Sequence, residues 1–176
     1  MSDLSASPSD VEVVAALLGR RPAGRFRVVV RRTDGTPAVI ENAPHLDDGT
    51  PMPTLFWLVD PVLHAAVSRV ESNGGVHRFE SLLDPEALQA AHNAYARRRE
   101  ALVVEHDRPQ PSGGVGGTRQ GLKCLHAHVA ASLAGLDDPA GDLVLAELDP
   151  AEVAGLVLVF EPDEEGTSSP VAGSTS

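Results

Sequence analysis

The 176-residue chain is 42% hydrophobic, has a formal net charge of −11 and contains a single cysteine. This hydrophobic content is typical of a globular protein, and one cysteine excludes an intramolecular disulfide and fits a reducing compartment. No apolar run approaches the roughly 20 residues of a membrane-spanning helix, and the N-terminus lacks a secretory signal. We therefore expect a cytoplasmic protein without membrane insertion.

Negative charge is concentrated at the C-terminal end. Residues 137–176 hold ten acidic and no basic side chains, whereas the preceding part of the chain is nearly balanced. Nucleic-acid-binding proteins are usually basic and offer aromatic rings for stacking. This chain is acidic, and only 3% of its 176 residues are aromatic. The composition therefore disfavours a nucleic-acid partner. It also predicts a disordered lead over 1–8, one domain over 9–160 and an acidic, Ser-rich disordered tail over 161–176.

The first elements form a helix and a hairpin. Ser9 begins a capping-box pattern that predicts a helix ending at Gly19. The stretch 25–32 places Phe26, Val28 and Val30 on one face and mostly arginines on the other, and a turn at Asp34-Gly35 leads to a return strand over 38–41. This pattern predicts a half-exposed strand whose arginines form a solvated face.

The rest of the chain predicts further helices and two short strands. Asp60-Pro61 and Asp84-Pro85 each place an N-cap residue before a proline, which is a typical helix start. These signals predict an α+β fold with a small, mostly antiparallel sheet and about four to five helices. The remaining predicted elements are a strand at 55–58, a flexible connection at 105–121, helices at 122–134 and 143–148, and a strand at 154–160.

The segment from Gly113 to Gly135 contains most of the candidate chemistry, including the only cysteine and the only lysine. Read as a helix, it places Cys124 and His128 four residues apart on one face and turns His126 towards the core. Read as a strand, it places all three side chains on one face. Its many alanines and the closing glycine favour the helix.

Two chemistries suit this segment. Cys124 and His128 could bind zinc or iron together with Asp48, and His45 or His92 could be a further ligand. Alternatively, Cys124 could be a nucleophile, because a helix start and neighbouring cations lower the pKa of a thiol. The candidate catalytic residues are Cys124, His126, His128 and Asp48. The competing interpretation is a buried, inert cysteine with a hydrogen-bonded core histidine.

The glycine run before this segment predicts an anion-binding loop. Backbone amides at a helix start favour negative charge, and nearby hydroxyl and cationic side chains would add donors. The spacing fits neither a P-loop nor a dinucleotide fingerprint, and a flexible connection is the simpler interpretation. The candidate anion-binding residues are Gly116, Gly117, Thr118, Arg119 and Lys123.

Four runs of residues carry a resemblance to a known family: DDGTPMPTLFWLVDP (47–61), AHNAYARRR (91–99), GLKCLHAHVAASLAG (121–135) and DPAG (138–141). The chain resembles the bacterial family catalogued as domain of unknown function 501 over about residues 10–148. The resemblance implies no established activity. Members are often encoded near a septum-formation initiator protein and an exopolyphosphatase-type enzyme, which points to envelope, division or phosphate physiology.

The chain departs from this family at the hairpin turn. Many members have a cysteine-rich turn where this chain has Arg32-Thr33-Asp34-Gly35. If that turn joins the cysteine of KCLH in a metal site elsewhere in the family, the site here is incomplete or uses Asp34. The departure therefore weighs against a structural zinc.

Three functional hypotheses follow. The first is a protein that binds an anionic small molecule or a protein partner through the 47–54 loop, the 113–121 loop and the helix start at 123–128. The second is a metal-assisted or thiol-dependent hydrolase that uses the candidate catalytic residues. The third is a non-catalytic interaction subunit that docks through its acidic tail and its arginine-rich strand.

Overall fold

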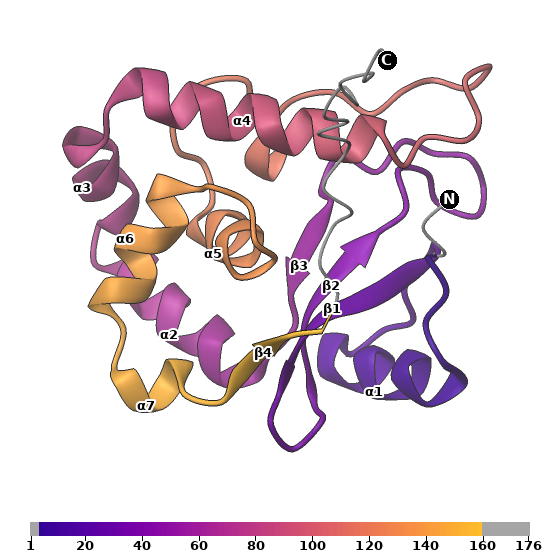
Figure 1. Ribbon diagram of the computed structural model, residues 1–176, viewed down its shortest axis with the longest axis horizontal. Coiled ribbons are helices and arrows are strands. Elements are labelled where there is room, and N and C mark those ends of the chain that lie inside the picture. The colour runs from indigo at the N-terminus through magenta and orange to yellow at the C-terminus, as the bar shows by residue number, and fades with distance from the viewer. Residues whose placement is uncertain (1–3, 160–176) are drawn as a thin grey trace, which may run out of the picture.

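The computed structural model describes residues 4–159 (Figure 1). The predicted tail at 161–176 and the first three residues of the predicted lead lie outside the described residues. None of the helices within 4–159 is long and apolar enough to cross a bilayer.

Four strands form one antiparallel sheet in the order β3-β2-β1-β4. The sheet and its helices confirm the predicted α+β class, with helices α3 and α7 in addition to the five expected from the sequence. The strands are β1 (Phe26–Arg32), β2 (Pro37–Asn42), β3 (Phe56–Leu58) and β4 (Leu156–Leu158). The helices are α1 (Pro8–Leu18), α2 (Pro61–Ser72), α3 (Gly75–Leu82), α4 (Pro85–Glu100), α5 (Leu125–Leu133), α6 (Pro139–Glu147) and α7 (Pro150–Val153), with a 3-10 turn η1 (Val115–Gly117).

Local capping determines where most helices begin. The carboxylates of Asp60 and Asp84 accept hydrogen bonds from backbone amides at the starts of α2 and α4, as predicted. Helix α1 begins earlier than predicted, because Ser7 rather than Ser9 is its N-cap and Pro8 occupies the first helical position. Leu4, within the predicted disordered lead, is buried.

The sheet is covered on both faces. Val14 of α1 packs with Phe26, Val28 and Ile40 on one side. On the other side, α5 lies between the sheet and helices α2, α4 and α6, where it is seen nearly end-on in Figure 1. The α5–α6 crossing is close, because a Cβ at Gly141 would lie 2.4 Å from the carbonyl oxygen of His128. Helix α5 is therefore the central element of the main core.

The hairpin arginines do not form the predicted solvated face. Arg27 is 5% exposed and pairs with Glu41, which is completely buried. Arg31 donates two hydrogen bonds to the carboxylate of Asp10 in α1. The prediction was wrong because helices cover both faces of the sheet. Helix α1 supplies Asp10 to Arg31, and on the opposite face Arg98 of α4 joins Glu41 beside Arg27.

Arg32, the last residue of β1, forms a further ion pair. Its guanidinium donates to both carboxylate oxygens of Asp60, at 2.8 and 2.9 Å. Asp60 also accepts from the amide of Leu63 at 2.8 Å. Burial raises the pKa of the Asp60 carboxyl, but the hydrogen bonds from Arg32 and Leu63 outweigh it, so the pKa lies below its ordinary value of 3.8.

This lowered pKa makes the contribution of Asp60 to stability dependent on pH. The contribution is fully present above the ordinary pKa and is lost as the pH falls through the lower, folded-state pKa. Asp60→Asn is therefore expected to lower the free energy of unfolding by about 1–3 kcal/mol at pH 7. The difference should shrink below pH 3.8. Urea unfolding of both proteins across this range tests it, and a difference that does not change with pH would contradict it.

Candidate functional site

The chain passes Cys124 in an extended conformation before α5 begins. Cys124 is the N-cap residue of α5, with φ −146° and ψ 113°, and its side chain is partly buried. The expectation that Cys124 and His128 share one face of a helix is therefore wrong. The first residue inside the helix is Leu125.

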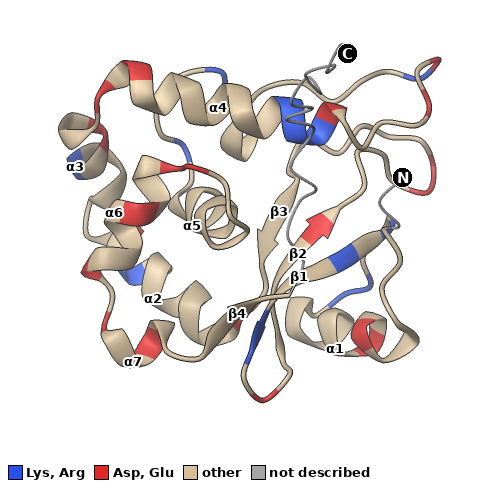
Figure 2. Cartoon of the chain, in the orientation of Figure 1, with Lys and Arg blue, Asp and Glu red and all other residues tan. Residues whose placement is uncertain are grey.

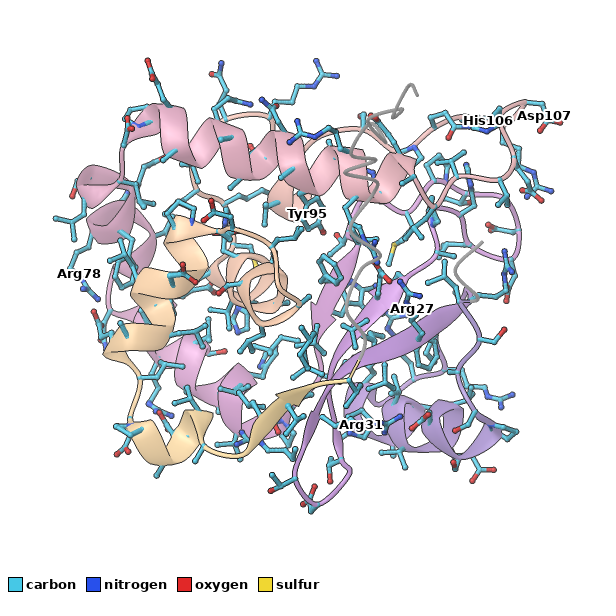
Figure 3. The ribbon with its side chains drawn as sticks, viewed as in Figure 1. Arg27, Arg31, Arg78, Tyr95, His106 and Asp107 are labelled. Carbon is cyan, nitrogen blue, oxygen red and sulfur yellow. The ribbon has the colours of Figure 1, made fainter. Side chains whose placement is uncertain are left out.

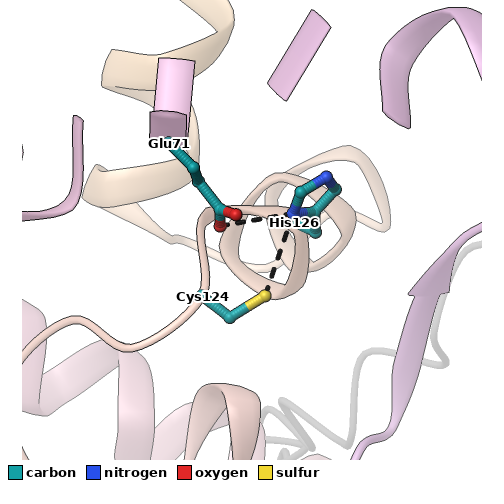
Figure 4. Close-up of side chains that lie close together, drawn as sticks. All are labelled: Glu71, Cys124 and His126. Carbon is teal, nitrogen blue, oxygen red and sulfur yellow. Dashed lines mark hydrogen bonds and ion pairs between the residues drawn. The ribbon is translucent and has the colours of Figure 1, made fainter. Parts of the chain in front are cut away.

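Cys124 lies beside His126 instead. The Sγ atom of Cys124 is 4.0 Å from Nδ1 of His126, and the same nitrogen is 3.2 Å from Oε1 of Glu71 in α2 (Figure 4). The thiol, imidazole and carboxylate ligand atoms all lie within 4.8 Å of one another. They form the only group of three such ligands that the structure shows among residues 4–159. We call these three residues the Cys124 cluster.

The other ring nitrogen of His126 is held by α2. Nε2 lies 3.1 Å from the carbonyl oxygen of His64 and 3.1 Å from Oγ of Ser68. A carbonyl can only accept, so Nε2 carries a proton and Nδ1 faces the thiol and the carboxylate. Burial lowers the pKa of His126, but hydrogen bonding to Cys124, the charge of Glu71 and the His64 carbonyl together raise it above its ordinary value.

Two glutamates determine the path of the chain into α5. Oε1 of Glu71 accepts a 2.6 Å hydrogen bond from the amide of Leu125, and Oε1 of Glu80 accepts a 2.9 Å bond from the amide of Leu122. These amides would otherwise lack partners ahead of the helix. Glu71 thus has two contacts, one to the backbone at the start of α5 and one to His126. Neither glutamate is among the site residues predicted from the sequence.

His128 lies on a different side of α5, in the core. Its side chain is completely buried, and Nδ1 lies 2.8 and 2.9 Å from the two carboxylate oxygens of Asp138. Its neighbour His92 is also buried, with its ring nitrogens bonded to the Val115 amide and the Gly121 carbonyl. The structure therefore gives His128 a buried hydrogen bond to a carboxylate and places Cys124 beside His126 instead. His92, considered as a further metal ligand, has both nitrogens engaged.

Asp48 and His45 do not join the Cys124 cluster. The exposed carboxylate of Asp48 accepts from the amide of Thr50, two residues along the same turn. Nε2 of His45 lies 2.9 Å from the carbonyl oxygen of Pro109. Both side chains therefore bond to backbone groups of loops and not to the Cys124 cluster.

The sequence predicts that the 47–54 and 113–121 loops meet at the start of α5. Gly116 and Gly117 lie close to residues of these segments. A Cβ at Gly116 would lie 3.7 Å from Cβ of Cys124, and one at Gly117 would lie 3.8 Å from Cβ of Pro53. Both glycines have positive φ, which other residues rarely adopt. Thr118 donates its hydroxyl to the carbonyl of Gln120, whereas Arg119 and Lys123 are exposed.

Comparison with known proteins places the chain in a family. The family model described as "Protein of unknown function (DUF501)" matches residues 28–146, which is more than half of the chain. This range includes all three members of the Cys124 cluster. No curated protein and no solved structure matches the chain. The chain therefore belongs to the DUF501 family of proteins of unknown function.

Proposed function

We propose that this protein binds a Zn²⁺ ion through Glu71, Cys124 and His126. The observation that supports this function is the meeting of a thiol, an imidazole nitrogen and a carboxylate oxygen in one place. Sulfur, nitrogen and oxygen ligands of these kinds are the ones that zinc uses in proteins. The ligands predicted from the sequence were Cys124, His128 and Asp48, and only Cys124 belongs to the Cys124 cluster.

The distances suit a tetrahedral ion. Zinc bonds of about 2.3 Å to sulfur and about 2.0–2.2 Å to nitrogen and oxygen imply separations of about 3.6 Å for S···N and about 3.4 Å for N···O. The observed separations are 4.0 Å from Cys124 to His126 and 3.2 Å from His126 to Glu71. Small side-chain rotations would bring all three atoms onto one ion.

The surroundings of His126 also suit a metal ligand. Ligating histidines usually donate their second ring N–H to a carbonyl or a carboxylate, which orients the first nitrogen towards the ion. The carbonyl of His64 accepts that bond here. Three protein ligands leave a fourth position for water or an anionic ligand, and the side chains of His126 and Glu71 are 17% and 28% exposed. This arrangement resembles an open zinc site more than a closed structural one.

We expect about one equivalent of zinc on the purified protein. Cys124→Ser and His126→Ala should each weaken zinc binding by at least about 100-fold. Each removes a direct ligand, and even the loss of a hydrogen-bond partner behind a ligand can lower metal affinity by about 10–100-fold. Glu71→Gln keeps an oxygen for the Leu125 amide but loses the charge, so it should also weaken binding while the helix start is retained. Elemental analysis and zinc titration against a chromophoric chelator measure these effects.

His106→Ala is the matched control. His106 is exposed on the loop after α4, at the edge of the molecule in Figure 3. Its removal should leave the zinc content unchanged. Co²⁺ replacement adds a direct signature, since a thiolate-to-cobalt absorption band should disappear in Cys124→Ser. Zinc retained equally by the wild type and the three cluster variants, or no zinc binding at all, would overturn the proposal.

A thiol-dependent activity is the second candidate, supported by the 4.0 Å approach of Cys124 Sγ to His126 and by the raised pKa of that histidine. An imidazolium beside a thiol favours the thiolate, which is the nucleophile in cysteine chemistry. Titration of the metal-free protein with a thiol reagent tests this candidate. Rapid modification that slows in His126→Ala supports it, and a thiol that reacts only after unfolding contradicts it.

A further inference from the structure

A polar cavity lies between α4 and the chain segment 111–119. Its volume is about 350 Å³. The polar groups that line it come from both sides, and neither side belongs to the Cys124 cluster. Among the lining residues are Gln89, Asn93 and Arg99 of α4, and Ser112, Gly113 and Arg119 of the opposite segment.

Arg99 brings a buried positive charge to this cavity. The residue is 1% exposed and donates to the carbonyl oxygens of Pro53 and Gly113, at 2.9 and 2.7 Å. Its Nε atom is buried and has no hydrogen-bond partner in the described part of the chain. No carboxylate within residues 4–159 forms an ion pair with it. Burial lowers the pKa of Arg99, which reflects the cost of a buried cation without a counter-ion.

Arg119 adds a second cation at the mouth of the cavity. It is exposed and makes no ion pair with the described residues. Glu100 is the one acidic residue among those that line the cavity, so two guanidinium groups face a single carboxylate. Figure 2 shows this end of α4 as a band of basic residues followed by an acidic one.

A more apolar cavity lies next to this one along α4. This neighbouring cavity of about 360 Å³ shares Gln89 and His92 with the first. Its lining adds the apolar residues Leu83, Pro85 and Leu88 and the acidic residue Glu80. Both ring nitrogens of His92 are bonded to backbone groups, so this residue separates the two cavities without offering a free donor. The two cationic side chains thus line the first cavity, and the apolar side chains line its neighbour.

We propose that this cavity binds a small organic phosphate monoester, with the phosphate group beside Arg99 and Arg119. Two guanidinium groups match a dianion better than a carboxylate, and Arg is the preferred residue for such contacts. The bound phosphate would also supply the counter-ion that Arg99 lacks. This site is independent of the zinc site proposed above.

Calorimetric titration with phenyl phosphate and with inorganic phosphate, at constant ionic strength, tests the cavity. Both ligands should bind the wild-type protein, because both carry the phosphate group that the two guanidinium groups face. Arg119→Gln should weaken phenyl phosphate binding by at least about tenfold, the effect of losing one charge-assisted hydrogen bond. Arg119 is exposed, so this variant should fold normally. Arg99 is unsuitable as the main variant, because it also holds Pro53 and Gly113.

Two matched control variants test whether binding depends on this cavity rather than on positive charge in general, and whether it is independent of the zinc site. Arg97→Gln removes an exposed arginine from the same helix, outside the cavity lining, and should change the affinity by less than about twofold. Cys124→Ser should likewise leave phenyl phosphate binding intact, even if zinc is lost. An equal loss in Arg97→Gln and Arg119→Gln, an affinity unaffected by Arg119→Gln, or no binding of phenyl phosphate at millimolar concentration would each overturn the proposal.

Discussion

Replacing Glu41 with alanine is expected to lower the free energy of unfolding by about 3–5 kcal/mol. Glu41 is completely buried in β2, where its carboxylate accepts from Nε of Arg27 at 2.6 Å and from Nε of Arg98 at 2.8 Å. The substitution would leave Arg27, itself 5% exposed, as a buried cation without this counter-ion. Removing one partner of a buried ion pair is costly because the remaining charge stays out of water.

Urea unfolding followed by circular dichroism measures this loss. The control is Glu147→Ala, which removes an exposed pair with Arg78 and should shift the midpoint little. The double variant Arg27→Met with Glu41→Leu should recover part of the lost stability, since apolar side chains of similar volume often replace a buried pair without cost. Equal effects of Glu41→Ala and Glu147→Ala would show that the buried pair is not important for stability.

Asp138→Ala is expected to cost about 2–4 kcal/mol, because two separate contributions are lost. The carboxylate caps α6 by accepting from the amides of Ala140 and Gly141. It also accepts from Nδ1 of His128, which is completely buried. Nε2 of His128 already lacks a hydrogen-bond partner among the described residues, so the variant would leave neither ring nitrogen with the partner seen here.

Two variants separate these contributions. Asp138→Asn keeps an acceptor oxygen for the cap and should lose less stability than Asp138→Ala. Asp142→Ala removes an exposed carboxylate from the first turn of the same helix, where it accepts from Ser132, and should cost about 0.5 kcal/mol or less. Chemical unfolding of the three variants gives the order. A loss at Asp138 no larger than that at Asp142 would contradict the importance of this buried contact.

Two helix starts that depend on signals within a few residues were predicted correctly from the sequence. Asp60-Pro61 and Asp84-Pro85 start helices because the cap and the first helical residue are adjacent in the chain. The start of α5 depends instead on Glu71 and Glu80, which reach it from α2 and α3. No pattern within 113–135 reveals those two contacts. This is why Cys124 was expected beside His128 but lies beside His126.

The ion pairs of the hairpin were only partly accessible to prediction. The predicted turn at Asp34-Gly35 made a hairpin but set no register, and the structure places Arg27 opposite Glu41. The arginines were interpreted as a solvated face. The partners of Arg31 and Arg32, Asp10 and Asp60, come from helix starts outside the hairpin. Only the packing of α1 and α2 against the sheet brings them together.

The pairing of β4 with β1 has a consequence for the order of folding during synthesis. Val30 pairs with Leu158, so the outer edge of β1 cannot be completed until almost the whole described chain has left the ribosome. The carbonyls of Glu152 and Ala154, which accept from Arg32, arrive equally late. The nascent hairpin therefore spends most of its synthesis with one open edge. That edge is the place where premature association of unfinished chains would begin.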